Sequence, residues 1–178
     1  MEGIFSSKIM FGMTVWGRIW NISGRLDKES RTSSSITKED IRKLQVLQNK
    51  CLRIVTNSDY KTPTKVLLQK KNSLSVHQLM AQLTLSQVYN IQQMKLPAYH
   101  YNRLFARGQN DVVPETRTLN NFTANRVEFK LSLARTHFFY QASRLWTALP
   151  DQIKSSRNKA TFKKRSKTWV KTDIMIKP

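Results

Sequence analysis

The stretch from Asn72 to Met94 contains no Asp, Glu, Lys or Arg, although charged residues make up 24% of the chain. Its apolar residues recur at helical spacing on two sides. One side carries Val76, Leu79, Met80, Leu83, Ile91 and Met94, and the other carries Leu85, Val88 and Tyr89. A helix that is apolar on two sides is normally surrounded by other elements, and the Ser, Gln and Asn residues in this stretch argue against a bilayer. The pattern predicts a helix from about Ser75 to Met94 at the centre of the core.

The rest of the chain is strongly basic, with 31 Lys and Arg against 11 Asp and Glu and a formal net charge of +20 at pH 7. Such a surface repels itself, and binding to a polyanion, most commonly nucleic acid, relieves the repulsion. Eight Phe, five Tyr and four Trp provide core anchors, whereas five Gly and five Pro are few for a sandwich of short strands. We therefore expect an all-α fold, a helical bundle around the central helix, with at most one short strand pair, which the alternation at 127–132 allows.

Caps and helical spacing divide the chain into four regions. Residues 1–20 are predicted to form an N-terminal helix, and residues 21–36 a mobile loop rich in Ser and Arg. Residues 37–108 form a helical domain with a helix at Thr37–Asn57, the central helix and a short aromatic helix at 98–107. In this domain, Thr62 as N-cap and Pro63 in the first turn begin a short helix that runs through Lys71. Residues 109–178 form a C-terminal extension with two helices, at 137–149 and about 158–172.

Two of these helices are amphipathic with a basic face. The arc of the Thr37–Asn57 helix that is expected to be buried carries Ile41, Leu44, Leu47, Cys51, Leu52, Ile54 and Val55. The cations on its other arc and on one face of the last helix are our candidates for nucleic-acid contacts: Arg42, Lys43, Lys50, Arg53, Lys163, Lys164, Lys167 and Lys171. Because acidic partners for i,i+4 pairs are nearly absent, nucleic acid is favoured over a merely solvated surface. Tyr99, Tyr101 and Phe105 are suited to stacking on bases, but core packing is the expected role.

The chain shows no constellation of catalytic or metal-ligating residues. His77, His100 and His137 are scattered and the aspartates are isolated, whereas metal-dependent phosphoryl transfer uses converging carboxylates. No glycine-rich phosphate loop is present. Cys51, the single cysteine, is expected to fill the core. We therefore expect no enzymatic activity, no metal and no cofactor from this chain alone.

The N-terminal segment is apolar but has neither a basic leader nor a small-residue cleavage site. Arg18 interrupts it before it reaches the length that spans a membrane. We expect no secretory signal and no transmembrane helix, and an intracellular location, either nuclear or cytoplasmic.

Four stretches in order resemble a known family. They are FSSKIMFGMTVWG (Phe5–Gly17), IRKLQVLQNKCLRIV (Ile41–Val55), TPTKVLLQKKNSLSV with the central helix, and SRLWTALPDQIKSSRNKATFKKRSKTWV (Ser143–Val170). This order is similar to the region after the polymerase palm in reverse transcriptases of non-LTR retrotransposons, the jockey/CR1-like elements. Members show "YG-x-x-x-WG", "LQ-x-K-x-x-R", "LWN-x-LP" and "FK-x-x-x-K" motifs. Phe11 and Thr147 depart from the first and third of these.

The resemblance implies a helical thumb and C-terminal extension that clamp a template–primer duplex. The family's paired-aspartate turn, its fingers, its palm and its endonuclease have no counterpart here, so no catalytic residue is carried over. We expect non-catalytic binding to the backbone of RNA, DNA or an RNA–DNA hybrid, with retroelement polymerase domains as a further partner. Two alternatives stay open: a protein-interaction module that packs against missing polymerase domains or a host protein, and a non-functional remnant.

Overall fold

The computed structural model describes residues 38–105 and 138–173. These two ranges contain helices and no strand, so the predicted all-α fold is confirmed. The helices are α3 (Lys38–Thr56), α4 (Thr64–Lys70), α5 (Val76–Met94), α6 (Ala98–Leu104), α7 (Phe138–Ala148), α8 (Asp151–Lys154) and α9 (Lys159–Asp173). The predicted N-terminal helix, the loop at 21–36 and the short strand at 127–132 lie outside the described residues.

The charge-free helix α5 begins and ends as its sequence predicts. Ser75 is the N-cap: its Oγ accepts from the backbone N–H of Gln78 at 3.4 Å, and Gln78 Oε1 accepts from the Ser75 N–H at 3.0 Å. This capping box satisfies two backbone donors that the first turn would otherwise leave unpaired. Lys95 ends the helix in the left-handed conformation, with φ 54°.

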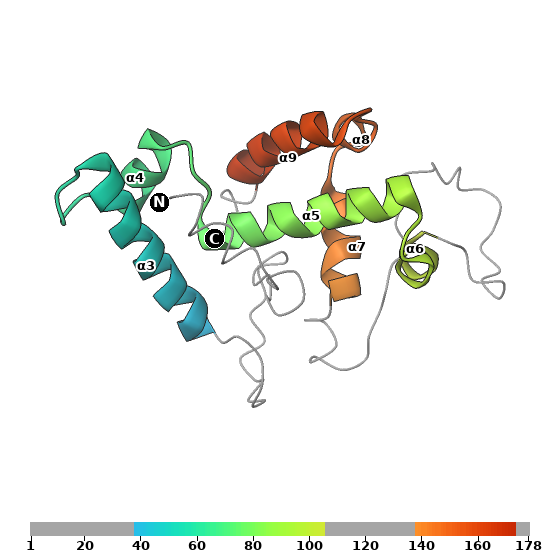
Figure 1. The fold of residues 1–178 in the computed structure, drawn as a ribbon, viewed down its shortest axis with the longest axis horizontal. Coiled ribbons are helices and arrows are strands. Elements are labelled where there is room, and N and C mark those ends of the chain that lie inside the picture. Colours follow the sequence, from blue (N-terminus) through green and yellow to red (C-terminus); the bar gives the residue numbers. More distant parts are fainter. Residues whose placement is uncertain (1–37, 106–137, 174–178) are drawn as a thin grey trace.

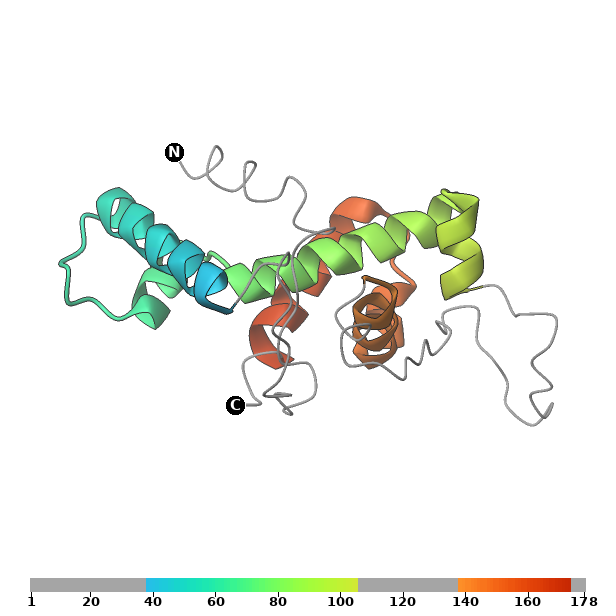
Figure 2. The ribbon, with the colours of Figure 1, turned by 90° about the horizontal axis from the view of Figure 1, so that it is seen from below.

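The other helices are arranged along α5, which forms the long axis of the molecule (Figure 1). α3 and α4 lie near its N-terminal end and α6 near its C-terminal end, while α9 runs alongside it. In Figure 1, α9 lies above α5 and α3 begins below it, and the view from below shows α9 crossing α5 (Figure 2). The main core joins residues on both sides of the predicted boundary at residue 108, from Ile41 to Val170.

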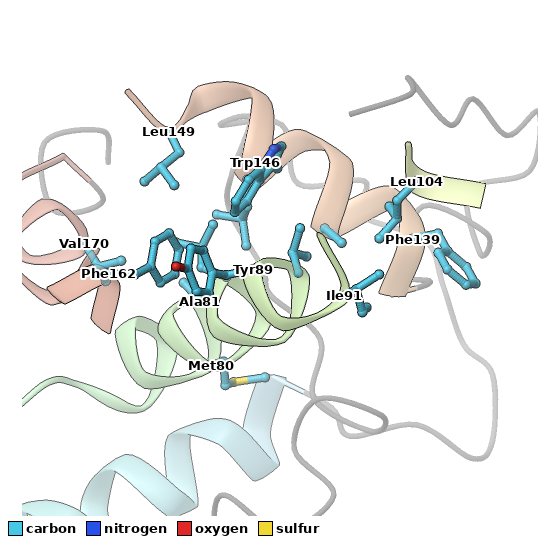
Figure 3. Close-up of a cluster of buried hydrophobic side chains, with 14 of the residues drawn as sticks. Met80, Ala81, Tyr89, Ile91, Leu104, Phe139, Trp146, Leu149, Phe162 and Val170 are labelled. Carbon is cyan, nitrogen blue, oxygen red and sulfur yellow. The ribbon is translucent and has the colours of Figure 1, made fainter. Parts of the chain in front are cut away.

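Both apolar sides of α5 are largely buried, as predicted, except that Met94 at its C-terminal end is 67% exposed. Met80 lies on the side of α5 that faces α3, whereas Tyr89 lies with Trp146 and Phe162 on another side (Figure 3). The Phe162 ring stacks on Tyr89 with centroids 4.3 Å apart and lies 6.0 Å from the Trp146 ring. Phe162 of α9 thus contacts α5 and α7, while Trp169 packs half-buried at the edge of the core.

α3 and α4 form a small unit with its own cluster of Leu52, Leu67 and Leu68. Two glutamines tie this unit to α5. Gln48 Nε2 donates to the Leu74 carbonyl at 2.7 Å, and Gln45 Oε1 accepts from the Val76 N–H at 3.0 Å. Polar side chains therefore join two apolar clusters, and each satisfies a backbone group at the start of α5.

The outward side of α3 differs from the prediction. Leu47 and Ile54 were expected to be buried, but their side chains are 49% and 70% exposed. α4 and α5 cover the side of α3 that carries Ile41 and Leu52, which are both 2% exposed. The predicted apolar arc was wider than the surface that these two helices cover. Cys51, predicted as a core filler, is half-buried.

The predicted start of one helix and the predicted number of helices in the C-terminal part also need correction. α4 begins at Thr64, one position later than predicted, because Pro63 is extended (ψ 143°) and acts as the N-cap without a side-chain cap from Thr62. In the C-terminal part, the chain forms the short helix α8 after Pro150, so the described extension has three helices rather than two. A proline fits the N-terminal edge of a helix because its missing N–H would be unpaired there anyway.

His77 in the first turn of α5 makes folding sensitive to pH. Burial lowers the pKa of His77 from its ordinary value of 6.5, so the folded state favours the neutral ring. The unfolded chain takes up the proton first as pH falls, so this histidine lowers the free energy of unfolding below about pH 6.5. We expect urea titrations between about pH 8 and 5 to show a smaller loss of stability in His77→Gln than in the wild type. Parallel curves for the two proteins would contradict this assignment.

Candidate functional site

The four lysines predicted on the last helix lie on one side of α9. Its inner side is set by Phe162, Ser166 and Val170, which follow each other at intervals of four residues and are 0% exposed. Lys163, Lys167 and Lys171 follow with the same interval on the adjoining side, and Lys164 lies next to them. Lys163 and Lys164 are exposed, while Lys167 and Lys171 are half-buried.

Polar residues of α5 hold α9 in this orientation. Gln78 Nε2 donates to the Val170 carbonyl at 3.4 Å, and Gln82 Nε2 donates to the Lys163 carbonyl at 3.1 Å. Tyr89 Oη donates to the Ser156 carbonyl, just before α9, at 2.6 Å. These three side chains form one stripe on α5 that was not predicted, since Tyr89 was expected only to contribute to an apolar side. Their spacing (i, i+4 and i+11) on one face of this charge-free helix was the available signal.

The basic side of α9 continues onto the end of α4. Lys171 Nζ donates to Asn72 Oδ1, which lies 99 positions earlier in the chain. Asn72 follows directly after two exposed lysines, Lys70 and Lys71. Lys70 Nζ in turn donates to Ser58 Oγ at 3.3 Å. We call the combined surface of Lys163, Lys164, Lys167, Lys171, Lys70 and Lys71 the α9 basic surface.

The electrostatics of this surface favour an anion. The pKa of Lys171 is lowered from 10.5, first by burial and second by the positive charge of Lys167 one turn earlier. Like charges at i,i+4 destabilise a helix. An anion placed between the two ammonium groups removes this repulsion.

The four cations predicted as contacts on α3 differ in their exposure and in their partners within the protein. Lys43 and Lys50 are exposed, and Arg42 forms an exposed ion pair with Glu39 at 3.6 Å. Arg53 binds within the protein: its Nη2 donates to the Thr62 carbonyl at 3.2 Å, and its guanidinium lies 5.3 Å from the Tyr60 ring centroid. Arg53 therefore holds the turn between α3 and α4.

The aromatic residues of α6 divide between core and surface. Tyr101 and Phe105 pack against the core, as expected. Tyr99 is 61% exposed, against expectation, and its Oη accepts from Arg103 Nη1 at 2.9 Å. The Arg103 guanidinium also lies 5.1 Å from the Phe139 ring centroid. Tyr99 is thus a surface residue that Arg103 holds in place.

Within residues 38–105 and 138–173, no three His, Cys, Asp or Glu side chains are close enough to hold a metal ion. None of the helices in these ranges is long and apolar enough to cross a membrane.

Comparison of the chain with protein-family models, curated proteins and solved structures finds no match.

Proposed function

We propose that this protein binds the phosphate backbone of RNA, DNA or an RNA–DNA hybrid through the α9 basic surface, without catalysis and without reading base sequence. The observation that carries the proposal is the row of lysines on one side of α9, in which Lys167 and Lys171 repel each other. The resemblance to the thumb region of retrotransposon reverse transcriptases supports the same function. In that family's arrangement, such helices clamp a duplex of template and primer.

The geometry of the row suits a polyphosphate better than a single anion. Lys163, Lys167 and Lys171 are spaced about 6 Å apart along the helix axis, since each residue adds about 1.5 Å. Lys70 and Lys71 extend the charge beyond the end of α9 through the Lys171–Asn72 contact. Lysine contacts to phosphates position a protein on a nucleic acid but carry no sequence information.

Filter binding to an RNA–DNA hybrid at several salt concentrations tests the proposal. If four of these lysines neutralise phosphates, the slope of log K against log salt is about −3.6, taking for the hybrid the coefficient of roughly 0.9 per phosphate that holds for duplex DNA. The affinity is expected to be similar for hybrids of unrelated sequence. Binding that does not change with salt would refute the proposal.

A further inference from the structure

The large apolar side chains on the outward side of α3 form a regular row. Leu47 and Ile54 are 49% and 70% exposed, and half-buried Cys51 lies between them. Leu44, one turn before Leu47, packs half-buried against the main core. The four positions alternate in steps of three and four, which is the spacing of a and d residues in a coiled coil. We call these four residues the α3 seam.

Within the described residues, the main core takes up only Leu44 of this seam, because α4 and α5 pack chiefly against other positions of α3. Ile41 and Leu52 face the interior, where each is 2% exposed. Asn49 Nδ2 donates to Thr64 Oγ1 of α4 at 2.9 Å. The seam lies on a different side of α3 from these contacts. Its two exposed members are seven residues apart, so one partner helix can cover both.

Two lysines border the seam at equivalent positions. With Leu44 and Cys51 at a positions, Lys43 and Lys50 both occupy the g position that precedes them. Both side chains are exposed, and neither forms an ion pair within the described residues. In a coiled coil, g-position lysines face residues at the edge of the partner helix, where acidic side chains stabilise the pair.

A second copy of this chain does not fit the seam. An antiparallel pair of α3 helices brings Lys43 and Lys50 against the same lysines of the other copy. A parallel pair brings them against positions equivalent to Gln48 and Val55, which are uncharged. Both arrangements also bring together two molecules with a formal charge of +20.

We propose that the α3 seam docks an amphipathic helix of another protein, one with apolar a and d residues bordered by Glu or Asp. The exposed apolar residues beside Lys43 and Lys50 favour such a helix over a phosphate backbone, which has no apolar groups for Leu47 and Ile54 to contact. The docking surface is separate from the α9 basic surface, so the protein carries a second binding function besides the proposed one.

The test uses a fluorescent 21-residue synthetic peptide with Leu at a and d and Glu at e and g, and measures anisotropy with the full chain. Salt at about 0.3 M weakens binding that rests on long-range charge alone. A second peptide keeps the Glu residues and replaces Leu by Gln. A third keeps Leu and carries Lys at e and g.

We expect the first peptide to bind the wild type and the other two to bind at least about tenfold more weakly. Leu47→Ser/Ile54→Ser lowers the affinity for the first peptide about tenfold or more. Lys43→Glu/Lys50→Glu is expected to reverse the preference, so that this variant binds the third peptide more tightly than the first. Val46→Ser is the matched control, because Val46 is 47% exposed on the same helix but lies off the seam; it is expected to bind like the wild type.

Three outcomes would overturn the proposal. The first is equal affinity of Leu47→Ser/Ile54→Ser and the wild type for the first peptide while circular dichroism shows both proteins folded. The second is equal binding of the Gln-substituted peptide, which would show attraction by charge alone. The third is a wild-type dimer in sedimentation that Leu47→Ser/Ile54→Ser converts to a monomer, which would identify a second copy as the occupant.

Discussion

Phe162→Ala is expected to lower the free energy of unfolding by about 3–5 kcal/mol, as is typical for the loss of a buried aromatic ring. The Phe162 side chain is 0% exposed and stacks on Tyr89 with an interplanar angle of 17°. Its removal leaves a cavity between α5, α7 and α9. Stacked aromatic pairs stabilise a fold by more than the area they bury. The substitution therefore weakens the contact that joins α9 to α5.

Urea denaturation followed by circular dichroism measures this change. Thr161→Ala is the matched control, because Thr161 is exposed on the same helix next to Phe162. This substitution is expected to change the free energy of unfolding by less than about 0.5 kcal/mol. A cost below about 1 kcal/mol for Phe162→Ala would mean that α9 is not packed as the structure shows. The same variant is expected to weaken binding to nucleic acid, because the lysines of α9 lose their fixed orientation.

Lys164→Glu/Lys167→Glu is expected to weaken binding to an RNA–DNA hybrid on the order of 100-fold near 0.1 M salt. The slope of log K against log salt becomes smaller in magnitude by about 2, since two phosphate contacts are lost. The change also places carboxylates beside Lys163 and Lys171, where phosphates would otherwise bind. The loss should be similar for all hybrid sequences, because backbone contacts carry no sequence information.

The control for this experiment is Lys43→Glu/Lys50→Glu on α3, which lowers the formal net charge from +20 by the same amount. If the α9 basic surface is the interface, the control keeps most of the affinity of the wild type. Equal losses in the two variants would show that net charge alone governs binding, and the assignment to α9 would be wrong. Unchanged binding in both variants would contradict the proposed function itself.

The central place of α5 in the core and the lysine face of α9 were both predicted from local sequence. The absence of charge from Asn72 to Met94 required that this helix be surrounded, whereas the capping box of Ser75 and Gln78 became visible only in the structure. The spacing of Lys163, Lys167 and Lys171 placed these lysines on one face of α9. Helix period and capping are local properties, since they depend on residues within about one turn of each other.

Tertiary structure alone decided which arcs of the helices are covered and which cations meet. A helical wheel gives the angles between Ile41, Leu47 and Ile54, but the placement of α4 and α5 determines that Ile41 is buried and the other two are exposed. The contact between Lys171 and Asn72 likewise joins segments 99 residues apart, and no local pattern encodes it. The sequence thus determined the helices and their faces. Packing between distant segments determined which faces remain free to bind, because burial depends on the neighbours that a face meets.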